Sequence, residues 1–271
     1  FWSMSASIAM RLVPEHQVSK ALAIFNGGNA VAMVIAPPLG SFLGGMIGWR
    51  GTFICLIPIA VIALIWQAVS LPSLEARRAA KPMDAIKLLW NPIALLGIVS
   101  VGLFFAGQFA LFTYIRPFLE NVTQVNVTTL SIVLFVIGGA GIVGTSLIGA
   151  FLKTRIYATL IVIPVVMAMI ALALIALGSS LLLTAVLMGF WGLIATAAPV
   201  GWWTWLAKSL PDDAEAGGGL MVAVIQLSIT LGATIGGIMF DGWGYRSAFV
   251  VSAVILLAAA AMAAVTSRTA S

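Results

Sequence analysis

Long uninterrupted runs of apolar residues, separated by short polar connections, make up most of this chain. About 20 helical residues cross the hydrocarbon core of a membrane. These runs are apolar on every side and about twice as long as barrel strands, which alternate polar and apolar residues. The pattern therefore predicts an all-α membrane protein. Nine spans are expected, the first of them shortened: 1–12, 21–46, 51–71, 92–116, 129–152, 156–177, 181–206, 217–239 and 247–266.

The composition supports this assignment and limits the function. Hydrophobic residues make up 62% of the chain and charged residues only 8%, whereas soluble domains carry about 25% charged residues. So few polar groups cannot cover a surface in water, which excludes a soluble enzyme. A membrane-embedded enzyme needs clustered His, Asp, Glu or Cys within the spans. His16 and Cys55, each the single residue of its type, lie far apart, so we expect no enzyme and no metal site.

The basic residues lie mainly on one side of the predicted spans. If successive spans alternate in direction, Arg50, Arg116 and Arg246 lie on one side and ten basic residues lie on the other. The positive-inside rule places the larger set in the cytoplasm. Four residues of this larger set lie in a long polar linker, residues 72–91. The ten basic residues of the set are Arg11, Lys20, Arg77, Arg78, Lys81, Lys87, Lys153, Arg155, Lys208 and Arg268.

An internal repeat indicates how the spans are organised. The sequence LGSFLGG at 39–45 reappears as LGATIGG at 231–237, and a Gly-Trp pair, an Arg and a Phe follow each copy. The copies lie six spans apart, so they share one orientation. We therefore expect parallel six-helix halves: residues 1–71 are the last three helices of the first half, and residues 92–271 are the complete second half. The whole protein is expected to have twelve helices, the layout of the major facilitator fold.

Several segments also resemble known families of that superfamily. Residues 29–45, with Ala36-Pro37-Pro38-Leu39-Gly40 and Gly44-Gly45, resemble the antiporter motif of drug:proton antiporters, with Ala36 in place of the usual Gly. More specifically, the chain resembles bacterial purine ribonucleoside exporters. The resemblance to these exporters lies in residues 1–7, 106–110, 113–117, 199–202 and 222–227. It implies a multi-pass protein of the inner membrane that exports nucleosides by proton antiport. It also makes Tyr114, within the matching residues 113–117, a candidate substrate contact.

Amide side chains within the spans are the main candidates for contact with a substrate. Asn26, Asn29, Gln108 and Gln226 lie within predicted spans, where an unpartnered amide costs a few kcal/mol. An amide both donates and accepts hydrogen bonds, which suits the edge of a purine base. The alternative is a structural bond between helices. Gln226 also begins a polar stripe that continues with Thr230 and Thr234 at helical spacing.

Aromatic and basic side chains extend the candidate site. Trp2, Trp191 and Trp202 could each stack on a base, an interaction worth about 1–3 kcal/mol. Packing is the alternative for Trp2 and Trp191, and an interfacial belt is the alternative for Trp202, which lies near Trp203 and Trp205. Arg116 is expected to act as an outer gate or ligand contact, or simply to anchor the helix at the interface.

Proton coupling is the least supported part of this interpretation. A proton-coupled carrier usually has an ionisable group within the membrane, but no carboxylate lies inside any predicted span. We expect that group in the helices thought to precede Phe1. No cofactor besides the proton and no nucleic acid are expected. The expected partners are the lipid bilayer and a small-molecule substrate, and the protein should be a monomer. Sugar or multidrug export, or a non-transporting membrane role, are the alternatives.

Overall fold

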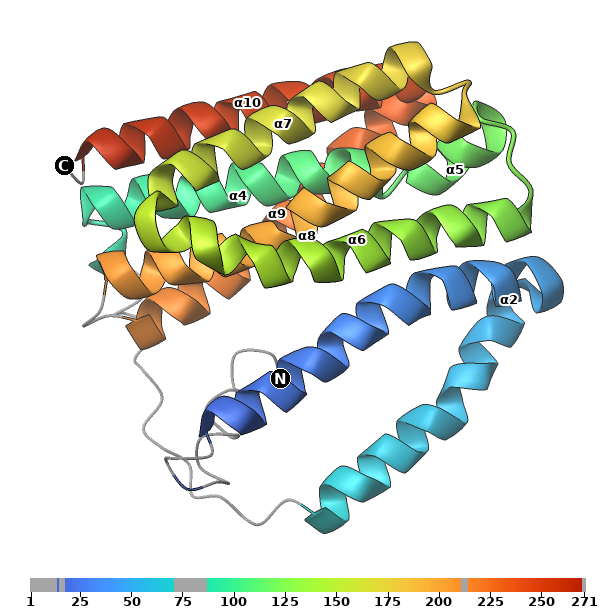
Figure 1. Cartoon of the computed structure of the whole chain (residues 1–271), viewed down its shortest axis with the longest axis horizontal. Helices are drawn as coiled ribbons and strands as arrows, with labels where there is room; N and C mark the ends of the chain where they lie inside the picture. Colours follow the sequence, from blue (N-terminus) through green and yellow to red (C-terminus); the bar gives the residue numbers. More distant parts are fainter. Residues whose placement is uncertain (1–13, 15–17, 71–86, 211–213, 270–271) are drawn as a thin grey trace.

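The computed structural model describes residues 14, 18–70, 87–210 and 214–269, and every regular element in these residues is a helix. Seven of the described helices are long and apolar enough to cross a membrane, which confirms the predicted all-α membrane fold. Span 1–12, with Trp2, lies outside the described residues. The elements are α2 (Val18–Ser70), α4 (Pro92–Phe112), α5 (Ile115–Asn121), α6 (Val127–Thr154), α7 (Ile156–Leu177), α8 (Leu181–Ser209), α9 (Ala214–Trp243) and α10 (Tyr245–Thr269) (Figure 1).

Helix α2 consists of two segments joined by a sharp bend, as Figure 1 shows. The bend lies at Gly48, whose φ of 74° and ψ of 166° are not helical, so the two segments correspond to predicted spans 21–46 and 51–71. Gly244, between α9 and α10, also has a positive φ, 81°. Each glycine lies two residues before an Arg of the internal repeat. By backbone conformation, Gly48 in the first copy of the repeat therefore corresponds to Gly244 in the second, and not to Gly242 as the matching Gly-Trp pairs suggested.

The bend at Gly244 gives a first testable prediction. We expect Gly244→Ala to lower the free energy of unfolding by about 1–2 kcal/mol, because a Cβ is strained at positive φ. A Cβ at this position meets no atom within 4 Å, so the cost is purely conformational. Gly242→Ala is the matched control, since that site is equally open and has no positive φ. Equal thermal unfolding temperatures for the two variants in detergent would contradict this explanation.

The break before α5 differs from the sequence prediction. A single span was expected over 92–116, but α4 ends at Phe112 and α5 begins at Ile115. Pro117 is the physical reason, because its ring nitrogen carries no hydrogen and its ring displaces the carbonyl four residues earlier, that of Thr113. Arg116 therefore lies inside the short helix α5 and does not end the fourth span.

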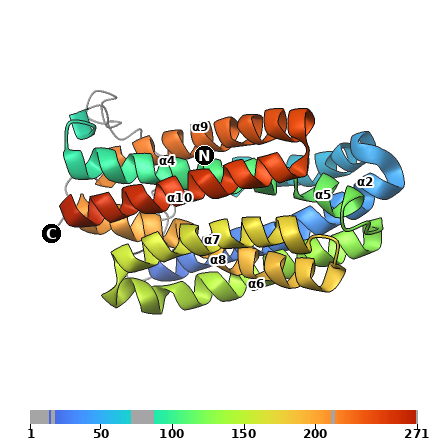
Figure 2. The ribbon, with the colours of Figure 1, turned by 90° about the horizontal axis from the view of Figure 1, so that it is seen from above.

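The helices form a bundle in which neighbours in space are often distant in sequence. Helix α4 packs against α9 and α10, α10 packs against α7, and α8 lies between α7 and α6. Figure 2 shows α9, α4 and α10 along one side of the bundle and α7, α8 and α6 along the other. Helix α2 packs mainly against α6. Its second segment, which includes Phe53, Ile62 and Trp66, exposes large apolar side chains.

Small residues allow the closest helix contacts. Gly144 of α6 faces the backbone of Leu193 in α8, and Gly192 of α8 faces the backbone of Ile137 in α6. Likewise, Gly232 and Gly236 of α9 face backbone carbonyl groups of α4. Without a hydrophobic driving force between helices in lipid, such close packing stabilises the association of membrane helices.

The two ends of the bundle carry different side chains. Lys208 at the end of α8 donates a hydrogen bond to the carbonyl of Leu152 near the end of α6, at 3.4 Å. At the opposite end, the Thr123 hydroxyl donates to the Gly178 carbonyl at 2.8 Å. These contacts confirm the predicted alternation for the helices they join. We call the end that carries Lys208 the basic end. Helices α6 and α10 also end there and α7 begins there (Figure 1), so Lys153, Arg155 and Arg268, which lie at those helix ends, share this end.

Candidate functional site

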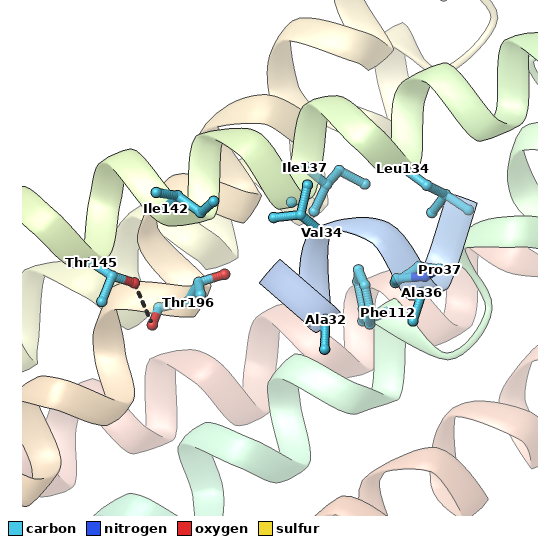
Figure 3. A pocket seen from close by; sticks show the side chains of 11 residues that line it. Ala32, Val34, Ala36, Pro37, Phe112, Leu134, Ile137, Ile142, Thr145 and Thr196 are labelled. Carbon is cyan, nitrogen blue, oxygen red and sulfur yellow. Dashed lines mark hydrogen bonds between the residues drawn. The ribbon is translucent and has the colours of Figure 1, made fainter. Parts of the chain in front are cut away.

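A cavity of about 410 Å³ lies where α2 meets α4, α6 and α8 (Figure 3). Small-molecule sites typically measure about 300–1,000 Å³ and have mainly apolar walls with a few polar groups. Among the described residues of its wall, the side-chain polar groups are the hydroxyls of two threonines. The cavity thus has the size and chemistry of a small-molecule site. Its lining residues are Ala32, Val34, Ala36, Pro37, Phe112, Leu134, Ile137, Gly138, Ile142, Thr145 and Thr196.

Small residues and a hydroxyl pair determine the shape of this cavity. A Cβ added at Gly138 would lie 2.8 Å from the Cα of Val34, so glycine is what lets α2 approach α6. The Thr145 hydroxyl donates to the carbonyl of Gly141 at 2.9 Å and to that of Thr196 at 3.3 Å. In Figure 3 the hydroxyl of Thr196 points toward the space between the labelled side chains. Thr196 thus offers a hydrogen-bonding group to an occupant.

Gln108 does not line this cavity, but it lies on the same face of α4 as a residue that does. It is four residues before Phe112, which lines the cavity, and four residues after Phe104, and residues four apart share a helix face. Its Oε1 atom is buried and has no hydrogen-bond partner among the described residues. Leaving an acceptor unpaired costs about 1–3 kcal/mol. Such atoms are rare in native proteins and call for a specific explanation, such as a bound water or ligand.

Three of the four tryptophans of α8 are buried, and the fourth, Trp203, is 40% exposed. Trp191 and Trp202 are only 1% and 2% exposed, and the Trp202 ring lies 6.5 Å from that of Phe104 and 6.1 Å from that of Trp205. The interfacial-belt alternative is therefore wrong for Trp202 and Trp205, because both rings face the interior of the bundle. Stacking of a substrate on Trp191 or Trp202 stays a prediction.

The candidates near α9 lie apart from the cavity. Tyr114 donates to the Ala233 carbonyl at 2.8 Å and stacks on Phe240 with ring centroids 5.3 Å apart, so it ties the junction of α4 and α5 to α9. Gln226 and Thr230 are exposed on α9, and the Thr230 hydroxyl donates to the Gln226 carbonyl at 3.0 Å. The polar stripe thus exists, but neither residue lines the cavity, and their contact with a substrate stays a prediction.

The remaining candidates lie on α2 and α5. Asn26 and Asn29 lie in α2, but their side chains fall outside the described part of the structure. The Arg116 guanidinium pairs with Glu120 at 2.9 Å, with both side chains exposed, and such surface pairs contribute about 0–1 kcal/mol. A Cβ added at Gly44 would lie 3.9 Å from Arg116 Nη1. Arg116 therefore reaches the bend of α2, and its gating or anchoring role stays a prediction.

Sequence reasoning singled out Ala36 and Pro37 of the cavity wall through the antiporter-like motif, but none of the candidate substrate contacts lines the cavity. Gln108 is a candidate because an amide is costly in an apolar helix. Trp202 of α8 packs against Phe104, which lies one turn from Gln108 on α4. Thr145, Thr196 and Phe112 were missed. Hydroxyl and aromatic residues are common in membrane helices, and no local signal distinguishes the ones that come together.

Comparison with known proteins gives a consistent family. The family model described as Major Facilitator Superfamily matches residues 1–229. A protein of Pseudomonas aeruginosa named "Transcription regulatory protein OpdE" is 54% identical over 99% of this chain and 68% of its own length. "Purine ribonucleoside efflux pump NepI" of Salmonella enteritidis is 43% identical over 97% of this chain and 66% of its own length. The protein of the same name in Salmonella typhimurium is 42% identical. The chain thus spans about two thirds of the length of these relatives.

Proposed function

We propose that this chain, which belongs to the Major Facilitator Superfamily, forms the cargo passage of a secondary active exporter. The observation that carries the proposal is the cavity of about 410 Å³ between α2 and the α4, α6 and α8 helices. It lies at a contact between α2 and α6, which the internal repeat assigns to different halves. In this fold type, halves that rock against each other expose a site to each side of the membrane in turn.

Purine ribonucleosides are the proposed cargo. Two relatives at 43% and 42% identity carry the name of a purine ribonucleoside efflux pump, and this supports the assignment. The chemistry of the site is also compatible: apolar walls accept the faces of a base, while the amide of Gln108 and the hydroxyl of Thr196 suit its polar edge. The proposed location is a bacterial inner membrane.

Proton antiport is the proposed energy source. A proton that moves down 100 mV releases about 2.3 kcal/mol, and one pH unit adds about 1.4 kcal/mol. At about 1.4 kcal/mol per tenfold, the total supports a cargo gradient of several hundredfold. Because no carboxylate lies within the predicted spans, the proton-carrying group is proposed to lie outside this chain.

Uptake into inverted membrane vesicles tests this proposal. Vesicles that contain the protein and carry an imposed proton gradient should accumulate labelled inosine, and they should stop when the gradient is dissipated. Arabinose and a cationic drug serve as comparators, because sugar and multidrug exporters share the fold. Accumulation of a comparator without inosine would refute the nucleoside assignment and leave the carrier in place. Accumulation of none of the three would contradict export itself.

Control of transcription is a second candidate function, because the relative at 54% identity is named a transcription regulatory protein. The two functions can be separated with a variant that is present at normal abundance but does not transport. If the loss of transport abolishes any effect of the protein on transcript levels, the effect depends on its cargo. If transcript levels still respond, regulation is a separate activity.

A further inference from the structure

A second cavity, of about 330 Å³, lies at the basic end of the bundle, where α4 and α7 begin and α8 ends. It shares no lining residue with the first cavity. Its wall also has a different character, because it combines an ammonium group with two hydroxyls on an aromatic and aliphatic floor. The lining residues are Ile93, Ile156, Tyr157, Trp205, Lys208 and Ser209.

Several hydrogen-bond donors around this cavity are not fully used. The Lys208 ammonium carries three N–H groups, and its contact with the Leu152 carbonyl at 3.4 Å occupies one of them. The hydroxyls of Tyr157 and Ser209 make no hydrogen bond within the described part of the chain. Helix α7 begins here, and the side chain of its N-cap residue, Arg155, makes no capping bond. The first amide groups of α7 are therefore also free to donate.

The charges around the cavity favour an anion. Lys153 and Arg155 are exposed at the same end of the bundle. Among the residues whose side chains the structure describes, the carboxylates are Glu120 and Asp241, and both lie at the opposite end, while Asp212, Asp213 and Glu215 follow Lys208 in the chain. Clustered charge of one sign attracts ions of the other sign. The second cavity thus brings the exposed Lys208 ammonium and several hydrogen-bond donors together at a pocket that is open on one side.

We propose that this second cavity binds a phosphate group and that the headgroup of an acidic phospholipid supplies it. Phosphate oxygens accept hydrogen bonds from lysine, from hydroxyls and from amide groups at helix starts. The cavity lies where α4 and α7 begin and α8 ends, which is the level of lipid headgroups, and Tyr157 belongs to a residue type enriched there. Basic pockets between membrane helices on the cytoplasmic side are known to bind acidic headgroups.

Lys208→Gln tests the proposal, with binding followed by thermal stabilisation of the purified protein in detergent as lipid is added. We expect phosphatidylglycerol to stabilise the protein at lower concentrations than phosphatidylcholine. Losing one charge-assisted hydrogen bond should weaken the apparent affinity for phosphatidylglycerol about tenfold. Lys153→Gln is the matched control, since this exposed residue carries the same charge at the same end without lining the cavity. Lys208→Arg keeps the charge and should retain binding.

Three results would overturn the proposal. Equal losses of affinity in Lys208→Gln and Lys153→Gln would show diffuse attraction to a basic surface. Stabilisation by inorganic phosphate at the same concentrations as phosphatidylglycerol would show that a soluble anion is the ligand. No preference for phosphatidylglycerol over phosphatidylcholine would show that Lys208 is already neutralised, for instance by Asp212 or Asp213, which follow it in the chain. Because none of these measurements depends on transport, they remain informative even if the export proposal fails.

Discussion

Replacing Gly144 by alanine is expected to remove most of the folded protein from the membrane. A Cβ at this position of α6 would overlap the backbone of Leu193 in α8, and a backbone cannot move aside as a flexible side chain does. Overpacking of this kind costs about 1–3 kcal/mol, and more where the helices must separate. Since α6 and α8 share one of the most extensive contacts of the bundle, we expect a several-fold loss of monodisperse protein on size exclusion and a lower unfolding temperature.

Gly149→Ala is the matched control for this prediction. It lies on the same helix, α6, and a Cβ there meets no atom within 4 Å. Alanine is the better helix former by about 1 kcal/mol, so this variant should be as stable as the original protein or more stable. Gly144→Ala is thus expected to lower the stability of the protein, whereas Gly149→Ala is expected to leave it unchanged or raise it. A Gly144→Ala protein that unfolds at the same temperature as Gly149→Ala would show that close contact between α6 and α8 does not hold the bundle together.

Gln108→Leu is expected to have opposite effects on stability and on export. Leucine has a similar size and removes the buried Oε1 that lacks a partner, so the free energy of unfolding should stay equal or rise by up to about 1–3 kcal/mol. Export of inosine should fall at least tenfold, because the cargo loses a hydrogen-bonding group beside the cavity. Unfolding temperature and vesicle uptake, measured on the same preparation, test both parts.

Gln226→Leu is the informative comparison. Its side chain is exposed on α9, so the substitution should leave stability unchanged, and its effect on export separately tests whether the polar stripe of α9 contacts the cargo. A Gln108→Leu protein that is less stable than the original would show that the amide has a structural role. Normal export by that variant would remove Gln108 from the site.

The predicted spans agree well with the helices because lipid leaves the backbone few alternatives. A segment in hydrocarbon must satisfy its own hydrogen bonds, so the length of an apolar run directly gives a helix. The span predicted over 156–177 coincides with α7. Within the described residues, the one clear deviation is the break between α4 and α5, which comes from Pro117, a local effect that hydrophobicity alone does not reveal.

The candidate site was less predictable because it depends on which helices pack together. Polar residues are candidates because each is costly in an apolar helix, but none of these candidates lines the cavity. The cavity itself, however, consists mainly of apolar side chains from four helices, with Val34 from α2 beside Ile137 from α6 (Figure 3). The positive φ of Gly244 likewise became informative only once it matched that of Gly48.

The most direct test of the carrier account is whether α2 must move relative to α6. Gly45→Cys and Val127→Cys, in a Cys55→Ser background, place two thiols at this contact. A Cβ at Gly45 would lie 3.5 Å from the Cβ of Val127, within the range of about 3.5–4.5 Å found in disulfides. Loss of both free thiols to alkylation would report the bond.

We predict that oxidation of this double variant stops the uptake of inosine into inverted vesicles and that a reducing agent restores it. Each single-cysteine variant should be unaffected by either treatment. If the protein with its disulfide fully formed transported at the rate of the reduced protein, α2 and α6 would not separate during transport, and alternating access through the cavity between them would be contradicted.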